Sequence, residues 1–448
     1  MNNHDLPEGF KMTELGPLPE EWEVVRLGSV ASVGPRRGPH RAQGLIPFVS
    51  MALLPEWGAD VENWELRPPE RVRSGVVVHE GDLLLAKITP SFENGKQGIV
   101  RKIPGGWGYA TTEVIPIRTS ERLVTEFLNY YLTLPTVRTD LAAKMEGTTG
   151  RQRLSKAVLL ALHLPLPPLP EQRAIAHVLR TVQRAKEATE KVIAATRELK
   201  KSLMRHLFTY GPVPVDQVDQ VRLKETAIGP VPEHWEVVRL GEVVDVKGGK
   251  RLPKGHSFSD TPTQHPYIRV VDFADGSITS SNLKFLTSDD FAVLQRYTIS
   301  SEDVYISIAG TIGLVGTVPE ELDGANLTEN AAKLVIRNKT KILRDFLKAA
   351  LSCNEQQRQI SALATKTSQP KLALARVKQL YIPLPPLPEQ RAIAEILRAV
   401  DRKLEAEERR KAALEAVFKT LLHHLMTGKI RLPRPLIAQF DQEAHHVL

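Results

Sequence analysis

The chain has 448 residues, of which 42% are hydrophobic and 25% are charged, and its formal net charge is +8. This length allows two to four globular domains, and the mild basicity is a weak indication of an anionic partner such as nucleic acid. Cys353 is the only cysteine, which excludes an internal disulfide and a cysteine-based metal site and indicates a buried core residue. The most apolar stretch, residues 157–164, is too short to span a bilayer, and the first residues lack a signal-peptide pattern, so we expect a soluble, cytoplasmic protein.

Two phrases in the sequence each occur twice. Residues 16–28, GPLPEEWEVVRLG, return with two substitutions at 229–241, and residues 165–176, PLPPLPEQRAIA, return letter for letter at 383–394. An internal repeat marks a repeated structural unit. We therefore predict two units, each built from a leading phrase, a variable body, a proline-rich joint and a long helix.

The positions of the repeats predict the domain boundaries. The predicted parts are a first body with its leading segment at 1–164, a joint and central helix at 165–211, a second body with its leading segment at 212–382, a joint and C-terminal helix at 383–430, and a tail at 431–448.

The first body is predicted to mix strands and helices. Short β-prone runs lie at 75–78, 83–86, 99–100 and 114–117, and a helical stretch follows at 123–145. Glycine-containing basic loops lie before these runs at 34–41, among them at 87–96 and after the helical stretch at 147–153. Their Arg and Lys side chains suit phosphates, and their Arg and Gln side chains suit base edges. The candidate DNA-binding residues here are Arg36, Arg37, Arg41, Lys87, Asn94, Lys96, Thr149, Arg151, Gln152 and Arg153.

The first long helix is predicted from Glu171 to about Phe208. This stretch contains no Pro or Gly, and its apolar residues recur at steps of three and four, which indicates an amphipathic helix with heptad character. Pro170 and Glu171 fit the preference for proline and acidic residues at a helix start.

The second body has β-prone runs at 267–271, 304–308 and 333–336 and a helical stretch at 342–363. Its basic loops fall at positions that match those of the first body, so that Arg37 aligns with Lys250, Thr149 with Thr367, and Arg153 with Lys371. The segment 307–313, which corresponds to the loop 87–96, carries no charged residue. The candidate DNA-binding residues of this body are Lys250, Arg251, Lys254, Thr367, Gln369 and Lys371.

The second long helix is predicted from Glu389 to about Thr427, with Gly428 as its C-cap. Its middle, residues 405–411, is nearly all charged. Two helices with such apolar stripes are expected to pack on each other as a coiled coil. The pattern alone leaves open whether the pair is parallel or antiparallel, and whether each helix instead packs only on its own body.

Motifs that carry catalysis are missing from the sequence. The Gly-Lys pairs at 95–96, 249–250 and 428–429 are not followed by Ser or Thr, so none forms a phosphate-binding loop. The Asn/Asp-Pro-Pro-aromatic loop of amino-methyltransferases, His-Glu-x-x-His and Gly-x-Ser-x-Gly do not occur either. The histidine pairs at 423–424 and 445–446 are interpreted as a helix end and a tail. The sequence therefore predicts no catalytic site and no metal site.

The doubled phrases and the long helix after each joint resemble the specificity subunits of Type I restriction-modification systems, the HsdS family. The resemblance covers essentially the whole chain. It implies an α+β protein with two α/β target-recognition domains, separated by two long helices that form an antiparallel coiled coil with a pseudo-twofold internal repeat.

The resemblance also implies a function and partners. Each recognition domain would read one half of an asymmetric bipartite site on double-stranded DNA, while the helices set the spacer and dock two methyltransferase subunits. S-adenosylmethionine would be used by those subunits, and ATP and Mg²⁺ by restriction subunits, so this chain would bind no cofactor and would not be an enzyme. The residues expected to dock subunits are Pro170, Glu171, Gln172, Arg173, Pro388, Glu389, Gln390 and Arg391.

Two other functions remain open from the residues alone. Scattered carboxylates could form a nuclease site, because such a motif is too loose to exclude. The coiled coil could instead belong to an assembly protein without a DNA role.

Overall fold

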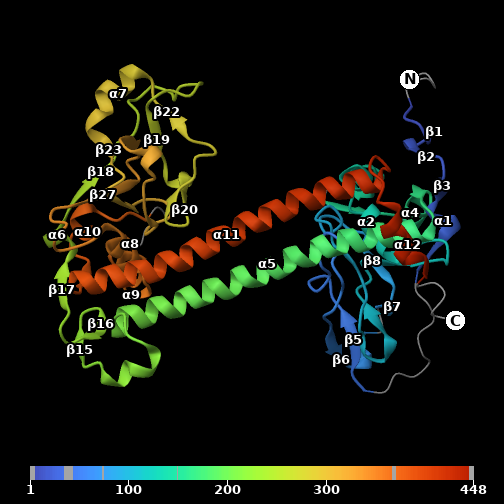
Figure 1. Ribbon diagram of the computed structural model, residues 1–448, viewed down its shortest axis with the longest axis horizontal. Coiled ribbons are helices and arrows are strands. Elements are labelled where there is room, and N and C mark those ends of the chain that lie inside the picture. The colour runs from blue at the N-terminus through green and yellow to red at the C-terminus, as the bar shows by residue number, and fades with distance from the viewer. Residues whose placement is uncertain (1–5, 35–43, 73–74, 149, 366–369, 443–448) are drawn as a thin grey trace. The chain divides into compact units, whose positions relative to one another are not determined.

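A computed structural model describes residues 6–34, 44–72, 75–148, 150–365 and 370–442 (Figure 1). The chain forms two compact units. Unit 1 comprises residues 1–191 and 408–448, and unit 2 comprises residues 192–407. Among the described residues, no helix combines the length and the apolar character needed to cross a bilayer.

Unit 1 contains two four-stranded sheets with the orders β4-β11-β8-β9 and β6-β5-β10-β7. In the second sheet β10 is parallel to β5 and antiparallel to β7. The strands of the first sheet are β4 (Ala31–Val33), β11 (Val114–Thr119), β8 (Leu83–Ala86) and β9 (Gln97–Ile99), and those of the second are β6 (Glu65–Arg67), β5 (Ile46–Val49), β10 (Trp107–Ala110) and β7 (Val76–His79).

Smaller elements complete unit 1. Residues 10–26 form a hairpin, in which β1 pairs with β2, and a strand, β3, which pairs with β14 where the chain enters the proline-rich joint. These elements are β1 (Phe10–Thr13), β2 (Gly16–Pro19), β3 (Glu23–Arg26), α1 (Leu27–Val30), α2 (Thr125–Tyr131), α3 (Pro135–Ala143), β12 (Glu146–Thr148), β13 (Arg151–Arg153), α4 (Lys156–Leu160), β14 (His163–Leu166) and α12 (Arg434–Gln442).

Unit 2 repeats this topology strand for strand. Its sheets have the orders β18-β27-β24-β25 and β22-β19-β26-β23, and the central pair β19 and β26 is again parallel. The strands are β18 (Val244–Gly248), β27 (Ala331–Ile336), β24 (Val304–Ser307), β25 (Val315–Thr317), β22 (Lys284–Phe285), β19 (Pro266–Ile268), β26 (Ala325–Leu327) and β23 (Thr298–Ile299).

The remaining elements of unit 2 largely follow the pattern of unit 1, but the hairpin of β20 and β21 and the helix α7 have no counterpart among the elements described for unit 1, and the hairpin of β12 and β13 has none among those described for unit 2. They are β15 (Leu223–Thr226), β16 (Gly229–Pro232), β17 (Glu236–Arg239), α6 (Leu240–Val243), β20 (Phe273–Ala274), β21 (Ser277–Ile278), α7 (Ser288–Leu294), α8 (Arg344–Ser352), α9 (Asn354–Leu363), α10 (Leu374–Val377) and β28 (Tyr381–Leu384).

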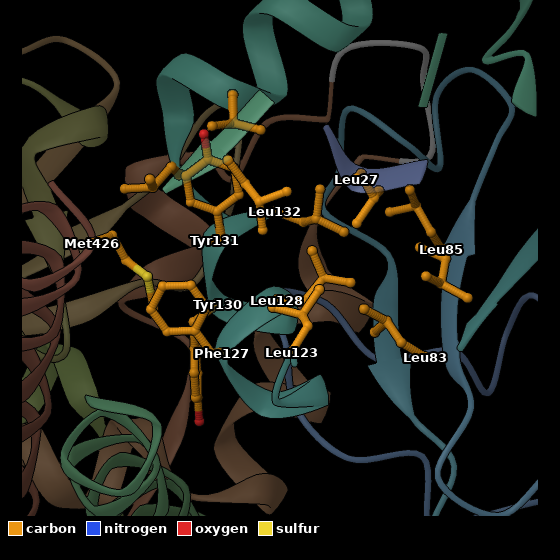
Figure 2. Packing of buried hydrophobic residues seen from close by; sticks show 14 of the residues in the cluster. Leu27, Leu83, Leu85, Leu123, Phe127, Leu128, Tyr130, Tyr131, Leu132 and Met426 are labelled. Carbon is orange, nitrogen blue, oxygen red and sulfur yellow. The ribbon is translucent and has the colours of Figure 1, made fainter. Parts of the chain in front are cut away.

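Each body has cores on both faces of one central strand. In β8, Leu83 and Leu85 face the large core shown in Figure 2, while Leu84 and Ala86 face a second core. Because successive side chains of a strand point to opposite faces, a strand buried on both sides reads as a continuous apolar run. This explains the run Leu-Leu-Leu-Ala of β8.

The long helices are α5 (Leu169–Tyr210) and α11 (Leu387–Met426), and they confirm the predicted helices to within about two residues at each end. In unit 1, Leu179 near the start of α5 shares a core with Leu422 near the end of α11. The helices therefore run antiparallel, as the resemblance implies.

Unit 2 contains the complementary halves of the pair. Leu207 near the end of α5 shares a core with Leu397 near the start of α11, and Lys200 Nζ lies 2.6 Å from Asp401 Oδ1. Each helix thus packs on its partner helix as well as on a body. Gly428 follows α11 with a φ of +67°, which matches its predicted role as a C-cap.

Candidate nucleic-acid interface

The repeated joint sequence forms the same buried contact in both units. In unit 1, Gln172 accepts a hydrogen bond from the backbone N–H of Val124 (2.8 Å) and donates to the carbonyl oxygens of Arg122 (3.0 Å) and Pro167 (2.8 Å). Its side chain is fully buried. The glutamine therefore ties the first turn of α5 to the start of α2 and to the joint.

The equivalent glutamine of unit 2 makes the same three bonds. Gln390 accepts from the N–H of Leu343 (2.9 Å) and donates to the carbonyl oxygens of Lys341 (2.8 Å) and Pro385 (2.8 Å). The identity of the two joints thus corresponds to an identical attachment of body to helix.

The neighbouring glutamate completes the attachment. The indole N–H of Trp22 donates to Glu171 Oε2 at 3.0 Å, and that of Trp235 donates to Glu389 Oε2 at 2.8 Å. In unit 1 Arg431 also donates to Glu171, from Nε to Oε1 at 2.5 Å. The repeated Trp and the repeated Glu are therefore partners.

The predicted docking residues differ in burial. Glu171, Gln172 and Gln390 are buried inside their own units, where they fix the body on its helix. Docking through these three residues stays a prediction. Pro170, Arg173, Pro388, Glu389 and Arg391 are half-buried or exposed, and docking through them stays a prediction.

In unit 1 the structure brings two of the predicted basic segments together. The hairpin of β12 and β13 lies against the start of the loop 87–96, because the N–H of Leu154 donates to the carbonyl oxygen of Lys87 (2.8 Å) and the N–H of Thr89 to that of Gln152 (3.1 Å). Arg151 and Arg153 are exposed on this hairpin. Four candidates therefore share one region: Lys87, Arg151, Gln152 and Arg153.

Unit 2 repeats this junction. The N–H of Leu372 donates to the carbonyl oxygen of Ile308 at 2.8 Å, and an isolated bridge joins Ala309 to Lys371 as another joins Ile88 to Arg153. Lys371 is exposed. Arg153 and Lys371, which align in sequence, thus occupy equivalent positions in the two bodies. Contact of either residue with DNA stays a prediction.

The other candidates of unit 2 lie on the loop after β18. Lys250, Arg251 and Lys254 are exposed there. The backbone of this loop is fixed, since Lys250 donates its N–H to the carbonyl oxygen of Leu327 (2.9 Å) and accepts from the hydroxyl of Tyr267 (2.9 Å).

Carboxylates stand beside an exposed arginine in both bodies. Arg153 Nη2 lies 2.9 Å from Glu113 Oε1, and Arg251 Nε lies 3.4 Å from Glu329 Oε1. Both glutamates belong to the turn before the long sheet strand, β11 or β27. An exposed ion pair of this kind contributes little to stability, so each arginine can exchange its carboxylate for a phosphate at small cost.

Lys96 has a different environment from the other cations. Its Nζ donates to the carbonyl oxygens of Met51 (2.9 Å) and Leu54 (3.1 Å), so it joins the loop 87–96 to the segment after β5. Asn94 is exposed at the turn of the same loop. The candidates Arg36, Arg37, Arg41, Thr149, Thr367 and Gln369 lie outside the described residues.

A buried polar network that the sequence pattern did not reveal lies under the loop of unit 1. Arg138 on α3 donates to the carbonyl oxygen of Phe92 (3.2 Å) and to the side-chain oxygen of Gln97. Gln97 donates to Asn129 Oδ1 (2.7 Å), and Asn129 Nδ2 donates to the carbonyl oxygen of Gly58 (2.7 Å). An arginine in a helical stretch normally indicates a solvated face, so no sequence signal marked it as buried.

The described residues offer no site for a metal ion. No group of three or more His, Cys, Asp or Glu side chains among them is arranged to hold one. The nuclease alternative therefore gains no support from this part of the chain.

Comparison with known proteins identifies the family. Residues 19–196 and 232–416 match the Type I restriction modification DNA specificity domain, and together these segments cover well over half of the chain. The chain belongs to this family. The two matched segments coincide with the two repeats, so the family domain occurs twice.

Relatives and solved structures agree with this assignment. The Type I restriction enzyme MjaVIII specificity subunit of Methanocaldococcus jannaschii is 27% identical over 95% of this chain and 96% of its own length. The EcoEI specificity subunit of Escherichia coli is 30% identical over 35% of this chain and 27% of its own length. The fold resembles that of the Type I restriction-modification S subunit from M. genitalium, with a TM-score of 0.58 at 18% identity over 90% of this chain and 96% of the other.

Proposed function

We propose that this chain is the DNA sequence-specificity subunit of a Type I restriction-modification complex and has no catalytic activity of its own. Each body reads one half of a bipartite site on double-stranded DNA. The observation that carries this proposal is a junction that occurs once in each body. There a basic segment, at Arg153 in unit 1 or Lys371 in unit 2, is joined through the backbone to the loop that follows the central strand.

The half-sites are expected to differ in sequence. The loop of unit 1 between β8 and β9 has ten residues, Lys87–Lys96, and includes charged side chains, whereas the loop of unit 2 between β24 and β25 has seven, Ile308–Leu314, and includes none. Base edges are read by the donors and acceptors that a protein presents to them. Loops of different length and charge therefore favour different bases.

The partners follow from the same proposal. Residues 1–164 and 212–382 are the recognition domains, and the segments 165–211 and 383–430 hold them and dock two methyltransferase subunits, which use S-adenosylmethionine. Restriction subunits supply ATP-driven translocation and Mg²⁺-dependent cleavage. The family relationship supports a complex with DNA and other subunits, and the stoichiometry is part of the proposal.

Arg153→Ala and Lys371→Ala test the proposal in the complex with the methyltransferase subunits. Base-resolved methylation mapping first defines the two half-sites and the spacer. Each substitution is then expected to weaken binding to the mapped duplex about tenfold and to reduce the slope of log K against log salt by about one, because one phosphate contact is lost.

Lys102→Ala is the matched control for these substitutions. The side chain of Lys102 is 80% exposed, and Lys102 follows β9 at the end of the β8–β9 hairpin away from the loop. Its replacement by Ala removes one positive charge, as Arg153→Ala and Lys371→Ala do. Affinities and salt slopes that are the same for Arg153→Ala, Lys371→Ala and Lys102→Ala would show that these segments do not contact DNA. A mapped site without two separated halves would also contradict the proposal.

A further inference from the structure

The same helical position supplies a side chain that holds the recognition loop in each body. Arg138 is the fourth residue of α3, and Gln357 is the fourth residue of α9. Both donate to a backbone carbonyl oxygen of the loop that leaves the central strand, at Phe92 in unit 1 and at Gly313 in unit 2. The two bodies have diverged in sequence, yet they keep this tether with different chemistry.

In unit 1 the tether is a buried guanidinium. Arg138 is 5% exposed, its Cζ lies 4.5 Å from the centre of the Phe92 ring, and its nitrogens donate to Phe92 and Gln97. The structure records no ion pair for Arg138 among the described residues. Burial lowers the pKa of this guanidinium to about 10, so it still carries its charge at neutral pH.

A buried cation without a carboxylate is costly to desolvate, and an apolar side chain of similar volume would often stabilise the fold at least as well. The hydrogen bonds of Arg138 therefore matter more for the arrangement of the loop than for the stability of unit 1. They hold the middle of the loop at Phe92 and the first residue after it at Gln97, while the start of the loop is fixed by the bond from Leu154 to Lys87.

In unit 2 the tether is a neutral amide. Gln357 Nε2 donates to the carbonyl oxygens of Gly313 (3.0 Å) and Leu351 (2.8 Å), and so joins the loop to the end of α8. Gly313 has a φ of +88°, and a Cβ placed there would lie 2.8 Å from Gln357 Oε1. The backbone of Gly313 therefore lies close to the end of the Gln357 side chain, and a larger residue at position 313 would crowd the amide that holds the loop.

We propose that Arg138 and Gln357 are positioning residues, each of which holds the recognition loop of its own body in the conformation that reads its half-site. This inference rests on the proposed function. A loop that has lost its tether is no longer bonded to its helix, although in unit 1 the carbonyl oxygen of Phe92 still accepts from the N–H of Gly95 (2.9 Å). Such a loop samples other conformations, so contacts with the correct base pair lose their advantage over contacts with a wrong one.

The test uses the full chain in complex with its methyltransferase subunits and duplexes that carry the mapped site. Single base-pair substitutions are placed in one half at a time, and discrimination is the ratio of the Kd for the substituted duplex to the Kd for the mapped one. Arg138→Met is expected to lower discrimination roughly tenfold in the half read by unit 1 and to leave the other half unchanged, since a net hydrogen bond supplies about that factor. Gln357→Met is expected to do the reverse.

Two further variants separate positioning from folding. Arg138→Lys retains the charge and a single donor nitrogen in place of the fork of the guanidinium, and it is expected to recover part of the discrimination that Arg138→Met loses. Gln357 is only half-buried, so Gln357→Met carries the test if Arg138→Met does not fold. Circular dichroism and the thermal midpoint of each variant report on folding.

The crossed pattern, in which each variant affects only its own half-site, supports the inference. Equal losses in both halves, or no loss in either, would overturn it. If Arg153→Ala and Lys371→Ala weaken binding while Arg138→Met and Gln357→Met change nothing, the positioning role fails and the DNA-reading function stands. If all four leave binding and discrimination unchanged, the part of the proposed function that assigns DNA reading to these segments fails together with the positioning role.

Discussion

At the scale of single residues, the repeated phrases consist of partners that are far apart in the chain. Trp22 binds Glu171 across 149 positions, and Trp235 binds Glu389 across 154. The sequence shows that both residues recur, but recurrence alone does not reveal which residue binds which. The buried state of Glu171 and Gln172 was missed for this reason, since acidic and amide side chains at a helix start are usually exposed.

The interpretation of Cys353 as a core residue is confirmed. Its side chain is 4% exposed, and it lies in the core of unit 2 with Phe346 and Ile360. Burial raises the pKa of the thiol to about 12, so almost no thiolate exists near neutral pH. Thiolate is the reactive form of cysteine.

We therefore expect Cys353 to resist thiol reagents in the folded chain. At pH 8 the reaction with Ellman's reagent is predicted to be at least about 100-fold slower than for the same chain in guanidinium, because the thiol is both buried and protonated. Release of one thiolate per chain in the denaturant is the control. Complete labelling of the native chain within minutes would contradict the burial.

At the scale of elements, helices were predictable and sheets were not. The period of α5 and α11 is local, and the absence of Pro and Gly marks their extent. Strand order depends on pairing between distant segments, such as β4 with β11, and on the crossed order of the second sheet. Short β-prone runs predict that strands exist but do not specify their neighbours.

The attachment of helix to body is expected to depend on the joint glutamines. Gln172→Ala and Gln390→Ala each remove three hydrogen bonds, one of them buried and two partly buried, and take a partner from backbone groups, which costs about 3 kcal/mol. Each is predicted to lower the midpoint of the first thermal unfolding transition by several degrees, measured by calorimetry on the full chain.

Arg391→Ala is the control for this pair, because Arg391 is the exposed residue that follows Gln390. It is expected to change the midpoint little. Glutamine variants that unfold no earlier than Arg391→Ala would show that the joint is not a stabilising attachment.

At the scale of the whole molecule, one scaffold carries two different loops. The strand orders of the two bodies are the same, and so are the bonds that fix each body to its helix. The loops between the last two strands of the first sheet differ in length, in charge and in the tether that holds them. In such a chain the strand order and the attachment of body to helix stay the same, while the DNA sequence that each body reads can change.

The helices are expected to act as the ruler of the DNA site. Deleting one heptad from the middle of α5 and the matching heptad from α11 keeps the apolar seam in register and shortens each helix by roughly 10 Å. DNA rises about 3.4 Å per base pair, so methylation mapping should find a spacer shorter by about three base pairs. Both half-sites should be unchanged, and altered half-sites would contradict the ruler.

The sequence by itself determined the twofold repeat, the two helices, the joints and the family, because these depend on periodicity and on identical phrases. Only the tertiary structure decided that the helices pair antiparallel by packing, that Gln172 and Gln390 are buried clamps, and that Arg153 and Lys371 meet a neighbouring loop in the same way. It also placed Arg138 inside unit 1 rather than in solvent. The reason is physical: burial and partner choice are set by segments that lie far apart in the chain, and no local pattern records them.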